Sequence, residues 1–165
     1  MADCGDQLVR DELAVRALAA AYTDAINRGA VDEAVHTYAE HSTFVMMNRP
    51  PVEGRDQIAE TLRATVARYL LIAQMLHSGI VLIDRDRARA RWQVTELQVA
   101  NDATRRFVLG RYEDECARPA NDWRFTSRKF TARYVGDVAL TSDVMPDEAT
   151  LFGLWDPLPP EGAPR

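Results

Sequence analysis

The first half of the chain shows the spacing of helices, and the second half shows the spacing of strands. Between residues 7 and 28, apolar side chains recur every three or four positions, which predicts a long amphipathic helix. Tyr22 lies on the apolar stripe of that helix. Shorter helical patterns cover residues 31–39 and 56–70, and a short strand is expected between them at 42–47.

Four longer segments after residue 70 have the pattern of strands, at 73–84, 88–100, 104–117 and 122–135. The turns between them are short and rich in Asp, Asn and Pro, so the pairing is expected to be antiparallel. Residues 75–83 are apolar on both faces, which indicates that both faces of the sheet are covered there. The helices can cover one face, and we expect the sheet of a second subunit to cover the other, in a homodimer.

A single domain accounts for a chain of 165 residues. The patterned part, residues 7–137, is the expected domain. Residues 138–156 lack periodicity but contain apolar side chains such as Trp155, so this segment is expected to dock on the domain or on the dimer. Residues 157–165 are rich in proline, and a disordered tail is expected there.

Composition and charge narrow the possible partners. Apolar residues make up 47% of the chain, charged residues make up 27%, and the net charge is −5. An acidic balance argues against nucleic acid as a partner. The sequence has no apolar run of membrane-spanning length. The acidic first residues do not resemble a secretory signal, so we expect a cytoplasmic location.

The sequence offers no motif for a bound cofactor or metal. It has two cysteines, no His/Cys cluster with metal-ligand spacing and no glycine-rich phosphate loop. No nucleophilic Ser or Cys motif is present either. Any catalysis is therefore expected to be cofactor-free acid–base chemistry on a small hydrophobic molecule, in an apolar pocket.

Five short motifs, in this order and spacing, carry a family resemblance. They are YAEHSTF at 38–44, EGRDQI at 53–58, LHS at 76–78, GRYED at 110–114 and WRF at 123–125. They resemble passages of the SnoaL-like and nuclear transport factor 2-like superfamily, and most of all its scytalone dehydratase and bile-acid 7α-dehydratase members. The resemblance implies a cone-shaped α+β fold, also described as a cystatin-like α+β barrel. In it, three helices are followed by four long strands, and the curved antiparallel sheet wraps around the N-terminal helices.

The resemblance also implies three catalytic residues. His77 matches the catalytic base of the dehydratases, and a histidine accepts a proton near neutral pH. Tyr22 matches a tyrosine that binds the substrate oxygen. Glu96 resembles an acid of bile-acid dehydratase, and an acid facing an apolar pocket can donate a proton.

Two further residues are expected to support the base. Asn27 stands where the dehydratases carry an aspartate that orients the histidine, and an amide can orient the ring without adding charge. Asp24 is the other candidate for the role of that aspartate, but it lies about 200° around the helix from Tyr22 and is expected to point away.

The remaining candidates are expected to line the pocket. They are Tyr38, Phe44, Met46, Trp92 and Phe130. Met46 stands where ketosteroid isomerase has its basic aspartate, which argues against a steroid isomerase of the standard type.

The function predicted first is a dehydratase, lyase or isomerase-like enzyme that acts on a hydrophobic cyclic substrate such as a steroid, terpenoid or polyketide. The residues at 27 and 46 favour a second interpretation, a non-catalytic ligand-binding dimer or the small structural subunit of an oxygenase. A polyketide cyclase, which would use the same pocket to form a carbon–carbon bond, is the third. Fold alone does not decide among them.

Overall fold

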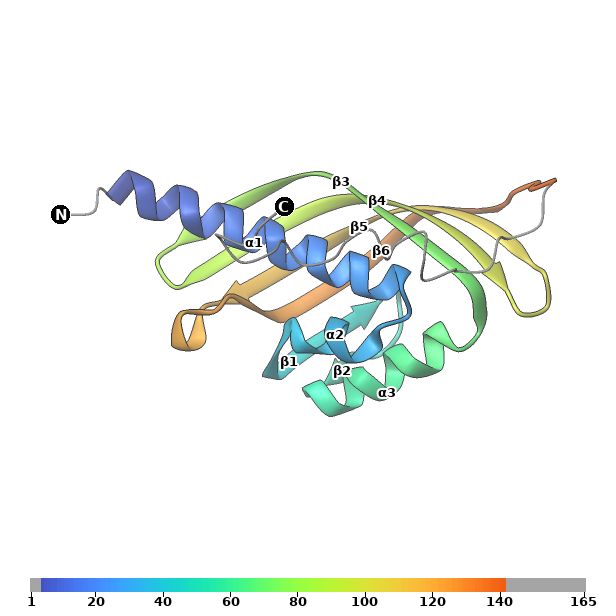
Figure 1. The fold of residues 1–165 in the computed structure, drawn as a ribbon, viewed down its shortest axis with the longest axis horizontal. Coiled ribbons are helices and arrows are strands. Elements are labelled where there is room, and N and C mark those ends of the chain that lie inside the picture. Colours follow the sequence, from blue (N-terminus) through green and yellow to red (C-terminus); the bar gives the residue numbers. More distant parts are fainter. Residues whose placement is uncertain (1–3, 142–165) are drawn as a thin grey trace, which may run out of the picture.

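Three helices lie against one side of a curved six-stranded sheet in the computed structural model, which describes residues 4–141 (Figure 1). The helices are α1 (Cys4–Asn27), α2 (Val31–His36) and α3 (Arg55–Val66). The strands are β1 (Tyr38–Met46), β2 (Val52–Glu53), β3 (Tyr69–Asp84), β4 (Arg87–Ala100), β5 (Arg105–Ala117) and β6 (Arg124–Asp137). Most of the predicted docking segment at 138–156, and the whole predicted tail at 157–165, lie outside the described residues.

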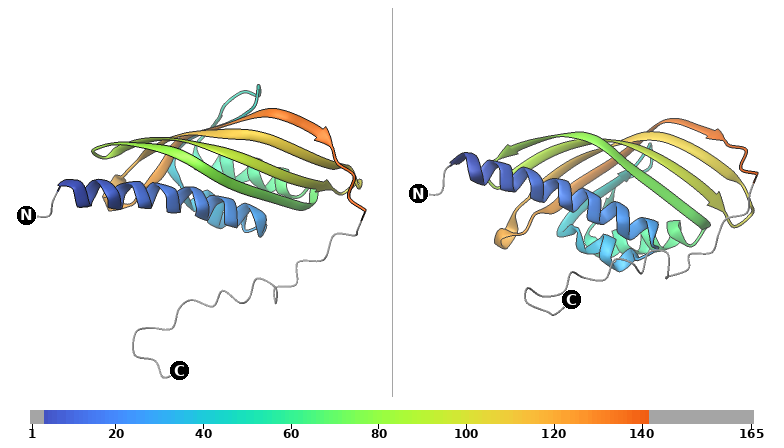
Figure 2. Two further views of the ribbon diagram at one scale, coloured as in Figure 1. Left: turned by 90° about the horizontal axis from the view of Figure 1, so that it is seen from above. Right: turned by 45° about the horizontal axis from the view of Figure 1, so that its top comes forward.

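The sheet has the order β2-β1-β6-β5-β4-β3, and its two edges, β2 and β3, do not meet. The four long strands pair antiparallel as expected, whereas β1 lies parallel to β6, which makes the sheet mixed. All three helices cover the inner side of the curve (Figure 2). The predicted α+β cone fold is confirmed.

The apolar stripe of α1 forms the centre of the core, and its buried members include Val15, Ala19, Tyr22 and Ile26. The second helix is shorter than the pattern at 31–39 predicts, because α2 ends at His36 and Tyr38 already pairs with Phe125 of β6. The two-residue strand β2 has no sequence pattern of its own.

A bulge divides β3 into two halves. Both His77 and Ser78 stand opposite the single residue Gln93 of β4. The extra residue reverses the alternation: over residues 72–76 the even-numbered positions are the more buried ones, and over residues 79–84 they are the more exposed ones. At Gly79 the backbone approaches the Trp92 ring so closely that a Cβ would lie 2.1 Å from Trp92 Cε3. Any larger residue at position 79 would displace this ring.

The other side of the sheet carries no helix in the described part of the chain (Figure 2). Met75 is 46% exposed there, Ile80 is 58% exposed and Leu82 is 64% exposed. A single chain therefore leaves uncovered the outward-facing apolar residues of the 75–83 segment from which a homodimer is predicted.

None of the helices within residues 4–141 is long and apolar enough to cross a membrane. The cytoplasmic location stays a prediction.

Candidate functional site

A cavity of about 220 Å³ lies between the helices and the inner side of the sheet. Most of its wall is apolar, and the side chains that form that part include Ile26, Phe44, Met46, Leu62, Val108 and Phe130. Its polar groups come mainly from α1, β3, β4 and β5. They include Tyr22, Gln74, Glu96, Gln98 and Tyr112. A few convergent polar groups in an apolar cavity are typical of a small-molecule site.

Glu96 is the carboxylate of this cavity, and its residue is only 6% exposed. Its Oε2 accepts a hydrogen bond of 3.0 Å from Gln74 Nε2, and its Oε1 accepts one from Gln98 Nε2. None of the ion pairs formed within residues 4–141 includes Glu96. The carboxylate is thus held by two neutral amides and by no cation.

Gln74 links the carboxylate to both α1 and Tyr112. Its Nε2 donates to Tyr112 Oη at 3.0 Å as well as to Glu96. Its backbone N donates to Asn27 Oδ1 at 2.7 Å, and Asn27 Nδ2 donates to its backbone O at 2.8 Å. Asn27 therefore fixes β3 to the end of α1 at Gln74, and not at His77.

Three buried tyrosines surround the inner end of the site. The Tyr22 ring lies edge-on to Tyr38 and to Tyr112, with centroids 5.9 and 6.0 Å away. Burial raises the pKa of each of the three hydroxyls, and the positive charge of Arg128 opposes this rise. The hydroxyls of Tyr22 and Tyr112, which line the cavity, are therefore protonated at neutral pH and can donate hydrogen bonds.

Alkaline titration followed at 295 nm should detect no ionisation of Tyr22, Tyr38 or Tyr112 at about pH 10, where a free tyrosine ionises. Their folded-state pKa values are raised, so their contribution to stability is complete below pH ~10 and is lost as the pH rises further. Unfolding and tyrosinate formation should coincide. Half-ionisation of all five tyrosines at about pH 10, in a chain whose circular dichroism is still native, would contradict this.

Arg128 lies behind the tyrosines and is completely buried. Its Cζ is 4.2 Å from the ring centroid of Tyr22, 3.8 Å from that of Tyr112 and 4.3 Å from that of Phe125. Cations attract the faces of aromatic rings at such distances. The guanidinium thus packs against the rings of two tyrosines of the cavity wall, Tyr22 and Tyr112, without lining the cavity itself.

Asp114 is the counter-ion of this cation. Its Oδ1 is 3.6 Å from Arg128 Nε, and its Oδ2 accepts a hydrogen bond of 2.8 Å from Trp92 Nε1. Burial alone would lower the pKa of Arg128, but the charge of Asp114 and the nearby tyrosines keep this pKa above its ordinary value. Arg128 therefore stays positively charged.

The structure places several of the predicted site residues on the cavity wall. These are Tyr22, Glu96, Phe44, Met46 and Phe130. Their roles stay predictions. Asp24 points away from the cavity as expected, with its Oδ2 2.9 Å from Arg28. Tyr38 and Trp92 do not line the cavity, because Tyr38 packs behind Tyr22 and the Trp92 indole turns toward Asp114.

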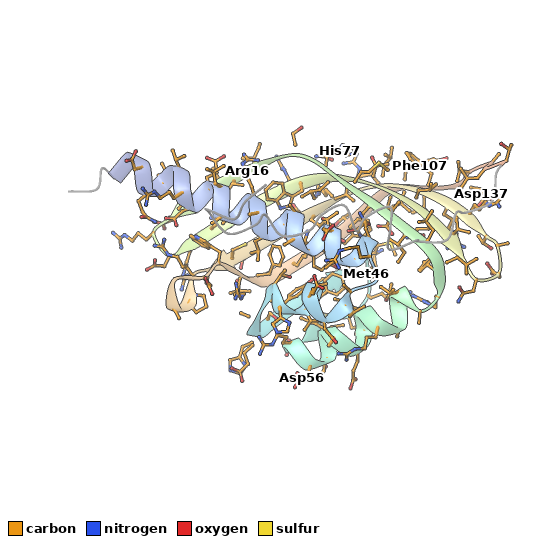
Figure 3. The ribbon with its side chains drawn as sticks, in the orientation of Figure 1. Arg16, Met46, Asp56, His77, Phe107 and Asp137 are labelled. Atoms are coloured by element: carbon orange, nitrogen blue, oxygen red, sulfur yellow. The ribbon has the colours of Figure 1, made fainter. Side chains whose placement is uncertain are left out.

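The prediction that His77 faces the pocket is wrong. Its side chain is exposed, and its Nε2 lies 2.7 Å from Thr95 Oγ1. His77 is on the side of the sheet away from the helices, far from Met46 (Figure 3). Between Ile72 and the bulge, the odd-numbered positions of β3 are the more exposed ones, and His77 continues that series.

Three polar residues of the site have no counterpart among the sequence candidates. Gln74 and Gln98 are neutral amides within strands, and Tyr112 enters the sequence analysis only as part of the GRYED motif at 110–114. The one signal in the sequence is that Gln74, Glu96 and Gln98 occur at inward positions of two neighbouring strands. Within residues 4–141, no three His, Cys, Asp or Glu side chains are grouped as metal ligands.

The sequence at residues 7–129 matches the SnoaL-like domain. The chain belongs to the SnoaL-like domain family. No protein of curated function matches the sequence significantly.

Solved structures show how widely the fold of this SnoaL-like domain is shared. The Kfla4162 protein of Kribbella flavida is 24% identical, with a TM-score of 0.72, over 78% of this chain and 95% of that one. Hexachlorocyclohexane dehydrochlorinase LinA-type3 of Novosphingobium barchaimii is 12% identical, with a TM-score of 0.76, over 84% and 97%. A ketosteroid isomerase-like protein of Erwinia carotovora atroseptica is 18% identical, with a TM-score of 0.66, over 74% and 95%. At these identities the similarity shows the fold alone.

Proposed function

We propose that this SnoaL-like domain is a cofactor-free acid–base enzyme of the dehydratase, lyase or isomerase type, acting on a hydrophobic cyclic molecule. The observation that carries the proposal is the Glu96 carboxylate, which faces an apolar cavity and has two amide donors but no cation beside it. A carboxylate in such surroundings is suited to proton transfer, because little water competes for it.

The reaction would begin with removal of a proton from carbon. Glu96 takes the proton from a carbon next to a carbonyl group, and negative charge develops on the carbonyl oxygen. Tyr22 or Tyr112 donates a hydrogen bond to that oxygen, as in an oxyanion hole. Glu96 then returns the proton, either to another carbon, which gives an isomer, or to a departing hydroxyl group, which leaves as water.

Two neighbours in the fold comparison support this class of chemistry. One is a dehydrochlorinase, whose name describes an elimination, and another is ketosteroid isomerase-like. In our proposal the base differs from the histidine expected from the sequence, because His77 is outside the cavity.

The proposal is tested by proton exchange, which needs no knowledge of the natural substrate. The protein would be incubated in D₂O with a panel of cyclic ketones and β-hydroxyketones, and deuterium uptake at the carbon next to the carbonyl would be followed by NMR. We expect uptake above the buffer rate for part of the panel. Ligands that bind in the cavity without any exchange would support the non-catalytic interpretation instead. Carbon–carbon bond formation on a linear polyketide would favour the cyclase.

The variant His77→Gln separates the two candidate bases. Because His77 lies on the outer side of the sheet, the exchange rate of this variant should stay within about twofold of the wild-type rate. A loss of several orders of magnitude would restore His77 as the base and refute the assignment of Glu96.

We also propose a homodimer, formed through the uncovered side of the sheet. Besides its exposed apolar residues, this side carries Arg89 opposite Glu115 and Arg91 opposite Glu113 on neighbouring strands. Arginines beside glutamates can complement a second copy related by a twofold axis. Light scattering should give the mass of a dimer at micromolar concentration, and a monomer would refute the proposal.

A further inference from the structure

Three arginines line the cavity, and the proposed chemistry gives them no role. They are Arg49, Arg68 and Arg106, and the side chains of all three are exposed. These three residues define what we call the mouth of the cavity. None of them is among the side chains that form ion pairs within residues 4–141. A protein with a net charge of −5 thus has three cations and one carboxylate, Glu96, around this cavity.

Backbone hydrogen bonds hold two of these arginines at the same end of the sheet. Arg68 is in the turn after α3, and its carbonyl accepts a 3.0 Å hydrogen bond from the backbone N of Asn101, in the turn between β4 and β5. Asn101 Nδ2 also donates to Ala67 O at 2.9 Å. Arg106 follows that turn at the start of β5, next to Phe107, which marks this end of the sheet in Figure 3. Both arginines therefore have a fixed backbone at the mouth.

The strand register places Arg106 relative to the proposed base. Arg106 pairs with Gln98, and Val108, two residues further along β5, pairs with Glu96. The three side chains of Arg106, Val108 and Tyr112 have the same parity and all line the cavity. Two residues of a strand span about 7 Å, which is close to the width of a substituted ring.

Two acidic residues lie near the mouth, and neither forms an ion pair with Arg68 or Arg106. Asp102 accepts a hydrogen bond of 2.9 Å from the backbone N of Thr104, which is the main reason that the pKa of this carboxyl is lowered, and Arg106 lowers it further. Asp137 stands opposite Arg106 in the ladder, but the two form no ion pair. Arg49 and Arg68 have no acidic partner among residues 4–141.

We infer that the ligand of this cavity carries a carboxylate at one end of a hydrophobic ring system, bound by Arg68 and Arg106. The opposite end of the ring, about 7 Å further in, lies at Glu96. The direction is set by charge, because a carboxylate placed at Glu96 would be repelled, whereas arginine binds carboxylates in a favourable planar geometry. Arg49, on the turn after β1, adds positive charge across the mouth. This inference rests on the proposed function for the orientation of the ring.

The test compares two ligands of the same shape, 2-naphthoate and its uncharged amide 2-naphthamide, by isothermal titration calorimetry. Charge-assisted hydrogen bonds to arginine should make 2-naphthoate bind about tenfold more tightly than the amide. Arg106→Gln and Arg68→Gln should each remove most of that advantage and leave 2-naphthamide unchanged. Arg10→Gln, at an exposed position of α1, is the matched control and should change neither ligand. Raising the salt concentration should weaken only 2-naphthoate.

Equal affinity of the two ligands for the wild-type protein would overturn the inference. Equal weakening of both ligands by the arginine variants would also overturn it, because it would indicate damage to the cavity. The deuterium-exchange assay separates this failure from that of the proposed function. Exchange on neutral ketones without a carboxylate preference would refute the ligand class and leave the chemistry standing. A carboxylate preference without exchange on any ketone would support the ligand class and refute the chemistry.

Discussion

The variant Asp114→Ala should destabilise the fold by about 3–5 kcal/mol, which lowers the melting temperature by about 6–20 °C. The physical reason is that Arg128 is completely buried and has Asp114 as its only ion-pair partner in the described structure. Without Asp114, a cation would remain among the rings of Tyr22, Tyr112 and Phe125 with no counter-charge. Trp92 Nε1 would lose its acceptor in the same change.

The matched control is Glu12→Ala, on α1 and outside both the cavity and the uncovered side of the sheet. The Glu12 side chain is 43% exposed and pairs with Arg16 at 2.7 Å, so its removal should cost less than about 1 kcal/mol. The double variant Asp114→Ala/Arg128→Met should recover most of the lost stability, because removing both charges removes the unpaired cation. Equal losses in Asp114→Ala and in the control, measured by thermal and urea unfolding, would show that the pair is not important for stability.

Regular periodicity accounts for the parts of the fold that the sequence predicted well. In β4, residues alternate between exposed and buried over the eight positions that begin at Arg87, and the buried ones include Ala90, Trp92 and Val94. The stripe on α1 is equally regular. When one face of an element is buried, its apolar residues must recur with the period of that element. The buried face of β4 or of α1 can therefore be predicted from a single sequence.

The bulge in β3 is a feature that regular periodicity does not predict. A strand of sixteen residues with an extra residue at His77–Ser78 changes its inward face half-way along. In the sequence this looks like a segment that is apolar on both faces, and it hides the side on which His77 lies. The position of the bulge depends on the pairing with Gln93 and on the close approach of Gly79 to Trp92, and both are tertiary contacts.

The polar part of the site was only half predictable, for a related reason. Tyr22 and Glu96 stand out because each is a polar group on an otherwise apolar face. Gln74 does not stand out, because its role depends on hydrogen bonds to three elements, through Asn27, Glu96 and Tyr112. The pairing of Arg128 with Asp114 needs the register between β5 and β6, in which the two residues stand directly opposite each other.

Glu96→Gln should lower the rate of proton exchange into a cyclic ketone by about 10²–10⁴-fold, the usual contribution of a general base. The change keeps the size of the side chain and removes its ability to accept a proton. Because Gln74 and Gln98 both donate to Glu96, one of their amides must rotate to accept from the new amide. The melting temperature must therefore be measured alongside the rate.

Binding and a second variant distinguish lost chemistry from a lost cavity. 2-Naphthamide should bind the Glu96→Gln protein about as tightly as the wild-type protein, because the apolar walls and the Tyr22 and Tyr112 hydroxyls are unchanged. Glu12→Gln makes the same chemical change on α1, outside the cavity, and should leave exchange unaffected. If Glu96→Gln kept the wild-type exchange rate, the described cavity walls would offer no other carboxylate or histidine for the role. The protein would then be better described as a binding module that uses this cavity without acid–base chemistry.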